Sequence, residues 1–148
     1  MAGWFGVAFA ASDPFAGRWD MDPQRSRYES GEVPRHMVIV MNPTSSGGIH
    51  YRSDTTLSNG NRVSSEYTAD YDGGLAMVLG TAGVMAPVSL RRVDERTIEC
   101  AYMKGSRVVA TSRRVISEDG STMTISTVFP AKDGTTTGTN VAVFDRAE

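Results

Sequence analysis

The stretch RVSSEYTADYDGG, residues 62–74, alternates between polar and less polar side chains and contains an Asp-Gly pair near its end. The less polar side chains fall at odd positions, namely Val63, Ser65, Tyr67, Ala69 and Tyr71. A period of two is typical of a β-strand with one buried face, because successive side chains of a strand point to opposite sides. Asp72-Gly73 supplies the positive φ angle that a tight hairpin turn needs. The stretch therefore predicts a strand over residues 62–71 followed by a reversal of the chain.

The same pattern continues on both sides of this stretch. Further glycine-containing turns are expected at Asn59-Gly60, Lys104-Gly105, Asp119-Gly120 and Asp133-Gly134. Between the turns the sequence predicts strands over residues 36–41, 48–57, 62–71, 75–79, 88–93, 97–103, 107–116, 122–129 and 137–145, with a tenth around Trp19. Strands joined by short hairpins pair with their sequence neighbours, and a long meander closes because an open sheet leaves unpaired edges. We therefore predict an all-β fold, a closed antiparallel meander β-barrel of about eight to ten strands.

Alternation assigns an inward face to most of these strands. Besides the odd positions of residues 62–71, the inward set is Ile49, Tyr51, Ser53, Leu57, Ile98, Cys100, Tyr102, Met123, Ile125, Thr127 and Phe129. Over residues 107–116 the two faces are equally plausible, and a bulge could switch the strand midway. The facing of Arg113 and Arg114 therefore stays open at this point.

Size, charge and cysteine content restrict the class of protein. The chain has 148 residues, with 15 basic and 17 acidic side chains and a net charge of -2, so it has no field of one sign to attract nucleic acid. Cys100 is the only cysteine, which excludes an internal disulfide and a two-cysteine redox motif. Two histidines at unrelated places give no metal-ligand spacing, and we expect neither a metal nor a cofactor.

The first residues differ from the rest. Residues 1–14 read either as the remnant of a signal peptide, with small residues at Ala10 and Ala11, or as an N-terminal helix. Residues 15–148 read as one barrel domain. A signal-peptide remnant implies a periplasmic or secreted protein, whereas an N-terminal helix would be compatible with a cytoplasmic one. No apolar run is long enough to span a membrane.

Several segments, in their order along the chain, resemble the calycin superfamily of lipocalins and fatty-acid-binding proteins. They are residues 15–19 (FAGRW), 26–28 (SRY), 66–73 (EYTADYDG), 88–94 (VSLRRVD) and 140–145 (NVAVFD). More specifically, the chain is similar to small bacterial exported lipocalin-like proteins of unsettled function. The resemblance covers residues 15–146 and implies a lipocalin-like barrel. It also implies that Trp19 closes one end of the barrel beneath a basic side chain, with Arg146 as the candidate and Arg114 or Arg92 as alternatives.

The candidate binding residues are those expected to line the interior. Four of the five tyrosines fall on inward faces, and phenols can orient a ligand while their rings cover its apolar body. Phe129 shares such a face, and two methionines, at and near the apolar loop of residues 80–87, could adapt to varied ligands. The predicted ligand-binding residues are Tyr51, Tyr67, Tyr71, Tyr102, Met77, Met85 and Phe129. An inward Arg113 or Arg92 would favour a carboxylate or enolate on the ligand, as in the fatty-acid-binding relatives.

Three functions fit this barrel. The first is binding of a small, largely apolar molecule in the cavity. The second is a cofactor-free isomerase or cyclase in which tyrosine or histidine gives acid-base assistance. In that case His50 would matter, but alternation places His50, Arg52 and Asp54 on the outer face. The third is a structural domain whose own side chains fill the barrel. The sequence leaves open whether the protein is an enzyme, and its oligomeric state.

Overall fold

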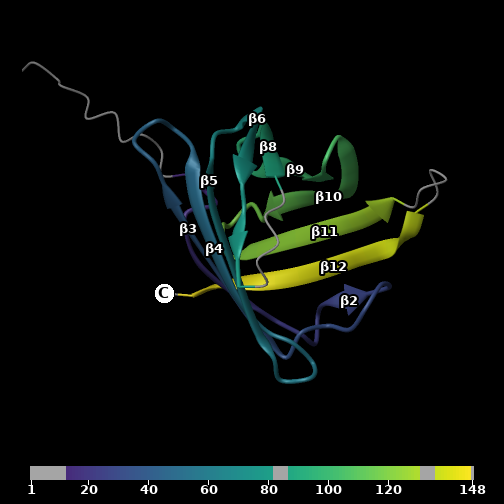
Figure 1. Cartoon of the computed structure of the whole chain (residues 1–148). Helices are drawn as coiled ribbons and strands as arrows, with labels where there is room; N and C mark the ends of the chain where they lie inside the picture. Colours follow the sequence, from purple (N-terminus) through teal and green to yellow (C-terminus); the bar gives the residue numbers. More distant parts are fainter. Residues whose placement is uncertain (1–12, 82–86, 131–135, 148) are drawn as a thin grey trace, which may run out of the picture.

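The computed structural model describes residues 13–81, 87–130 and 136–147. Every regular element in these ranges is a strand (Figure 1). The strands are β1 (Gly17–Met21), β2 (Arg27–Tyr28), β3 (His36–Pro43), β4 (Ile49–Thr56), β5 (Arg62–Ala69), β6 (Asp72–Met77), β7 (Leu79–Gly80), β8 (Pro87–Asp94), β9 (Thr97–Lys104), β10 (Arg107–Ile116), β11 (Thr122–Pro130) and β12 (Thr136–Ala147). The described residues contain no helix long and apolar enough to cross a membrane. The prediction of an all-β fold is confirmed.

The strands form one nearly closed antiparallel barrel. Their order is β6-β8-β9-β10-β11-β12-β1-β3-β4-β5-β7, so most strands pair with their sequence neighbours, as in the predicted meander. β12 pairs with β1 and joins the two ends of the chain, and β2 extends the same side of β12. Figure 1 shows β11 and β12 crossing the steeper β3, β4 and β5. This architecture is compatible with a calycin-like fold.

The segment from β6 to β7 differs from the single strand predicted over residues 75–79. β6 pairs with β8, whereas β7 pairs with β5 on the other side, so the chain changes partner at Val78. Ala76 and Val78 pack against the core, while Leu75, Met77 and Leu79 face outward and are at least half exposed. The segment therefore bridges the last gap in the barrel with an apolar outer face.

Antiparallel alternation gives the barrel two different ends. One end, which we call the plugged end, contains the start of β1 and the turns at residues 44–48, 70–71, 95–96 and 117–121. The other end, which we call the mouth, contains residues 29–35 and the turns at residues 57–61 and 105–106. Asp13 to Ala16 lie across the plugged end, where Phe15 and Trp19 are fully buried.

Trp19 and Arg146 hold the plugged end together. The Trp19 indole donates a hydrogen bond to the Phe15 carbonyl at 3.0 Å, and the Arg146 guanidinium lies 4.2 Å from the centre of the indole ring. Arg146 also donates to the carbonyls of Pro14 and Ala16. The assignment of Arg146, rather than Arg114 or Arg92, to this position is confirmed. Such a cation-π contact contributes about 0.5–2 kcal/mol.

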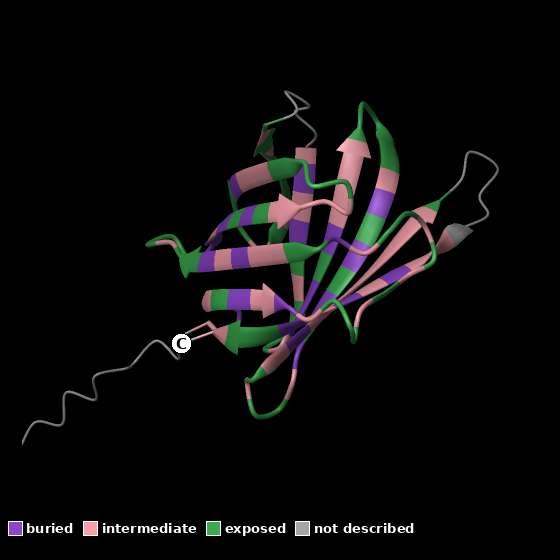
Figure 2. Ribbon diagram, turned by 90° about the horizontal axis from the view of Figure 1, so that it is seen from below, coloured by how far each residue is buried: buried purple, intermediate pink, exposed green. Residues whose placement is uncertain are grey.

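Alternating burial shows that the interior of the barrel is the core. Buried and exposed bands alternate along the strands in Figure 2. The buried residues include Met41, Ile49, Ile98, Ile116 and Met123, all toward the plugged end. Cys100 is also buried, as expected of a small apolar side chain. The plugged half of the barrel is thus filled by its own side chains.

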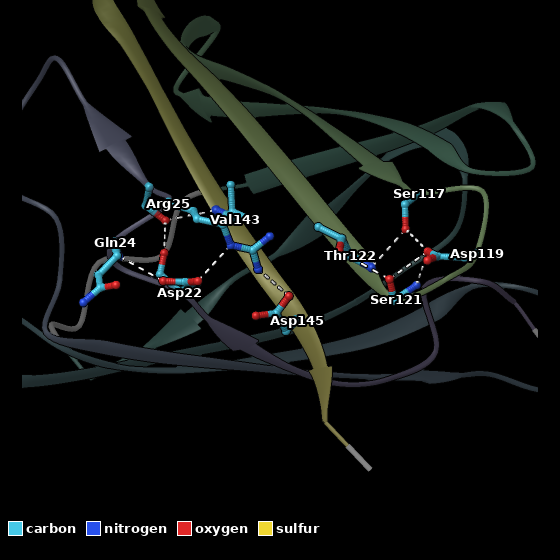
Figure 3. A network of polar contacts seen from close by, with 10 residues as sticks. Asp22, Gln24, Arg25, Ser117, Asp119, Ser121, Thr122, Val143 and Asp145 are labelled. Atoms are coloured by element: carbon cyan, nitrogen blue, oxygen red, sulfur yellow. Dashed lines mark hydrogen bonds and ion pairs between the residues drawn. The ribbon is translucent and has the colours of Figure 1, made fainter.

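Polar clusters fasten the surface segments to the barrel (Figure 3). In the connection that follows β1, Asp22 accepts a hydrogen bond from Arg25 at 2.8 Å, and Arg25 also binds Asp145 of β12. In the turn between β10 and β11, Asp119 accepts hydrogen bonds from the hydroxyls of Ser117 and Ser121, both at 2.7 Å. These hydrogen bonds lower the pKa of Asp119 to about 2, because they stabilise its charged form.

We expect Asp119→Asn to destabilise the fold at neutral pH and to become indistinguishable from wild type in strong acid. The pKa of Asp119 is lower in the folded protein, so its stabilising effect is present above the unfolded value near 3.8 and is lost as the pH falls toward about 2. Urea unfolding of both proteins from about pH 7 down to about pH 2 measures this difference. A difference that stays constant over this range would contradict the prediction.

Candidate functional site

The interior arginine is Arg114. On β10 the buried residues are Ala110, Ser112, Arg114 and Ile116, so the even positions face inward. Arg113 is exposed on the outer wall, 3.7 Å from Glu99. The facing that the sequence left open is therefore outward for Arg113 and inward for Arg114. Arg92 lies at the plugged end.

Arg114 is surrounded by tyrosines. Only 1% of its surface is exposed. Its Nη2 atom donates hydrogen bonds to the hydroxyls of Tyr67, at 2.9 Å, and Tyr102, at 3.2 Å. The guanidinium carbon lies 4.8 Å from the centre of the Tyr51 ring, and the rings of Tyr51 and Tyr67 stack with centres 4.7 Å apart. Three of the predicted ligand-binding residues thus meet around one cation.

The charge of Arg114 is not matched by a carboxylate. Among the described residues Arg114 takes part in no salt bridge, and its Nε and Nη1 atoms have no hydrogen-bond partner. An arginine keeps its proton in proteins, and an unpaired buried charge is strongly unfavourable. The hydroxyl of Ser112, two residues away on the same face, is also buried without a partner. The interior therefore holds unused hydrogen-bonding capacity beside a positive charge.

The neighbouring phenols remain protonated. Burial raises the pKa of Tyr51 to about 12 and raises that of Tyr67 well above its usual value. The oxygens of Tyr67 and Tyr102 accept hydrogen bonds from Arg114, so their own O–H groups are available as donors to another acceptor. The site therefore offers donors and a cation, which suits an anion.

A cavity of about 120 Å³ lies beside Arg114 in the interior of the barrel. Arg114, Tyr51 and Tyr102 line one side of it, and the remaining lining residues include four apolar side chains and three polar ones. The other lining residues are Tyr28, Met37, Ile125, Thr127, Asn140, Ala142 and Phe144. The cavity thus combines an apolar wall with a cationic corner.

The sequence did not single out Tyr28, Met37 and Asn140 as lining residues. Tyr28 enters the barrel because β2, in the connection between β1 and β3, pairs with β12. The Asn140 side chain accepts a hydrogen bond from the backbone N–H of Ser30 and donates one to the Ser30 carbonyl, both at 2.9 Å. Alternation on residues 137–145 could have indicated Asn140, since Ala142 and Phe144 share its face.

The other predicted binding residues lie elsewhere. Tyr71 is at the plugged end, where its hydroxyl donates to Asp13 at 2.6 Å. Met77 is on the outer wall, and Phe129 is partly buried on β11 outside the cavity lining. Met85 falls outside the described residues, as do residues 1–12 with the signal-like stretch.

The Asp13 carboxylate forms the centre of a second polar cluster. In addition to the hydrogen bond from Tyr71, the carboxylate accepts one from Arg92 at 2.9 Å. The Arg92 guanidinium lies 4.3 Å from the centre of the Tyr71 ring. These contacts fasten Asp13 across the plugged end.

The histidines lie outside the barrel. His50 is on the outer face of β4, 3.3 Å from Glu66, and Arg52 pairs with Asp54, so the expected outer placement of this trio is confirmed. Across the described ranges, no three His, Cys, Asp or Glu side chains group as metal ligands do.

A scan against protein-family models found no match for the chain, and a search of curated proteins found none either.

Proposed function

We propose that the barrel binds a small, largely apolar molecule that carries one anionic group, and that Arg114 holds this group. The observation that supports the proposal is the buried Arg114 guanidinium, which has two nitrogens without partners and lies beside a cavity. The Nη1 group of Arg114 can donate a charge-assisted hydrogen bond to an oxygen of a carboxylate. The O–H group of Tyr102, which lines the cavity, supplies a further donor.

The size of the cavity favours a compact ligand. Its volume of about 120 Å³ is close to that of the engineered cavity of ~150 Å³ that binds benzene in another protein. The apolar wall would cover one ring or a short branched chain, and Tyr51 would stack on it. A long unbranched chain would exceed this space. The proposed class is therefore compact carboxylates such as benzoate.

Calorimetric titration with benzoate and with benzamide tests the proposal. The two molecules have the same shape, but only benzoate carries a charge. We expect benzoate to bind at one site and benzamide to bind at least about tenfold more weakly, because hydrogen bonds to charged groups contribute about 1.5–3 kcal/mol each. Equal affinities, or no saturable binding of benzoate, would contradict the proposal. Native mass spectrometry of the purified protein then tests for a retained natural ligand.

The affinity for benzoate should fall in acid, following protonation of the ligand. Arg114 keeps its charge, and burial raises the pKa of Tyr51 to about 12, so both keep their protons at neutral pH and in acid. Only the neutral benzoic acid is present in strong acid, and it cannot pair with the guanidinium. Titrations from about pH 7 down to about pH 3 should therefore follow the ionised fraction of the ligand. An affinity that does not change with pH would argue against a charged ligand.

The cellular compartment of the protein is a separate part of the proposal. We infer export to the periplasm or the medium from the signal-like residues 1–11. N-terminal sequencing of the protein recovered from its native cells tests this inference. Cleavage near Ala10 or Ala11 would support it, and an intact N-terminus would contradict it.

A further inference from the structure

The two ends of the barrel carry charges of opposite sign. The turns of the plugged end contain four carboxylates, Asp70, Glu95, Glu118 and Asp119, against one cation, Arg96, and Asp94 lies beside them at the end of β8. The described part of the mouth instead carries four exposed cations, Arg35, Arg62, Lys104 and Arg107, against two carboxylates, Glu29 and Glu32. The net charge of -2 hides this separation.

The cations at the mouth are not neutralised locally. Within residues 13–81, 87–130 and 136–147, none of these four side chains takes part in a salt bridge, whereas Arg18, Arg52 and Arg113 on the outer wall each contact a carboxylate. Arg35 and Arg62 flank the turn at residues 57–61, and Lys104 and Arg107 face each other across the next mouth turn. Positive charge is thus spread around the opening.

The plugged end is too far away to cancel this charge. A strand of eight residues such as β4 is ~27 Å long, at about 3.4 Å per residue. The Debye length at physiological ionic strength is ~8 Å. An anion near the mouth therefore interacts mainly with the mouth cations and is screened from the carboxylates at the other end.

The cavity extends from the middle of the barrel toward the mouth. Tyr28, Met37, Tyr102, Thr127 and Asn140 line it from strand positions nearer the mouth, and Tyr51, Arg114 and Phe144 from positions nearer the plugged end. Phe15 and Trp19 fill the plugged end. A ligand that approaches Arg114 from the mouth would pass the mouth cations.

We infer that the mouth cations attract anionic ligands from solution and make the mouth their route to Arg114. This inference rests on the proposed function. The four cations are exposed and do not line the cavity, so they act on the approach of the ligand and not on the bound state. Charges placed in this way change the association rate and its salt dependence more than the dissociation rate.

Stopped-flow binding of salicylate, a fluorescent compact carboxylate, tests the inference. The variant Arg62→Glu with Lys104→Glu reverses two mouth cations. The matched control, Arg18→Glu with Arg113→Glu, makes the same change in net charge on the outer wall. We expect the mouth variant to associate about tenfold more slowly at low salt, the lower end of the range for electrostatic steering, with a nearly unchanged dissociation rate. The control should associate about as fast as wild type.

Two further measurements of the association rate, with added salt and with an uncharged ligand, complete the experiment. Added sodium chloride should slow wild-type association and remove the difference between the variants, since it screens exposed charges. Salicylamide, which is uncharged, should show no such dependence. Equal association rates for the mouth variant and the control, with wild type binding salicylate, would overturn this inference alone. No saturable binding of salicylate to wild type would overturn the proposed function, and the inference with it.

Discussion

Arg114→Met is expected to abolish binding of benzoate and, at the same time, to make the empty protein more stable. Each charge-assisted hydrogen bond to the ligand that is lost contributes about 1.5–3 kcal/mol, which corresponds to at least about tenfold in affinity per bond. The stability should rise, because methionine replaces a buried charge that pairs with no carboxylate, and an unpaired buried charge is strongly unfavourable. Methionine can occupy the space of the arginine stem without its charge. Calorimetric titration and urea unfolding measure the two effects.

The neighbouring residue provides the control. Arg113→Met removes the same charge from the same strand, but on the outer wall, where Arg113 is exposed beside Glu99. We expect it to change affinity and stability very little, since exposed ion pairs contribute about 0–1 kcal/mol. If Arg114→Met bound benzoate as wild type does, Arg114 would not hold the ligand. If it strongly destabilised the fold, the guanidinium would be a structural group satisfied within the barrel.

Trp19→Ala should produce the largest loss of stability, about 3–5 kcal/mol, as for other buried aromatic residues replaced by alanine. The indole is fully buried, donates to the Phe15 carbonyl and lies beneath Arg146, so the substitution opens a cavity and removes both contacts. With a typical domain stability of about 5–15 kcal/mol, the variant is expected to unfold at a much lower temperature. Thermal and urea unfolding measure the change.

An exposed apolar residue serves as the comparison for Trp19. Leu75 is 66% exposed on the outer face of β6, and Leu75→Ala should leave the stability almost unchanged. A loss of less than about 1 kcal/mol for Trp19→Ala would mean that the plugged end contributes little to the fold. Similar losses for the two variants would contradict the burial described above.

The fold was predictable from local sequence because each strand carries the same two signals. Alternation over residues 62–71 identifies an inward face, and Gly60, Gly105 and Gly120 lie in turns between strands with positive φ angles of 88°, 62° and 74°. The prediction of a turn at Asp72-Gly73 was wrong in position, because the chain reverses at residues 70–71 and Asp72 and Gly73 begin β6, which pairs with β8. Tyr51 and Tyr67 could be placed together for the same reason, since both lie on inward faces of neighbouring strands and pair directly. Nearest-neighbour pairing then leaves few topologies to choose from.

The position of the interior arginine was not predictable, because a single bulge decides it. β9 and β10 begin in register at Lys104 with Arg107 and at Met103 with Val108, but Tyr102 then pairs with Ala110. Had the first register continued, Cys100 would face Thr111 and the inward side of β10 would include Arg113. One additional residue on β10 turns Arg114 inward instead. Both faces of this strand have similar polarity, so alternation alone cannot locate the bulge.

Met77 shows a second limit of local patterns. Residues 75–79 contain apolar side chains at every position, so alternation gives no face, and the exchange of partners between β8 and β5 depends on contacts distant in sequence. Tyr28 entered the cavity by a similarly distant pairing with β12. Such placements depend on how distant strands pair in the closed barrel, so the pattern of one strand cannot predict them.

The pairing of β1 with β12 has a consequence for synthesis of the protein in the cell. β1 begins at Gly17 and β12 ends at Ala147, so the pair that joins the two walls brings together residues about as far apart as this chain allows. A ribosome therefore releases almost the whole chain before the barrel can close. Until then the partners of β1 and the contact of Arg146 with Trp19 are missing. The barrel should accordingly close only after β12 has left the ribosome, on the slow timescale of proteins with long-range pairing.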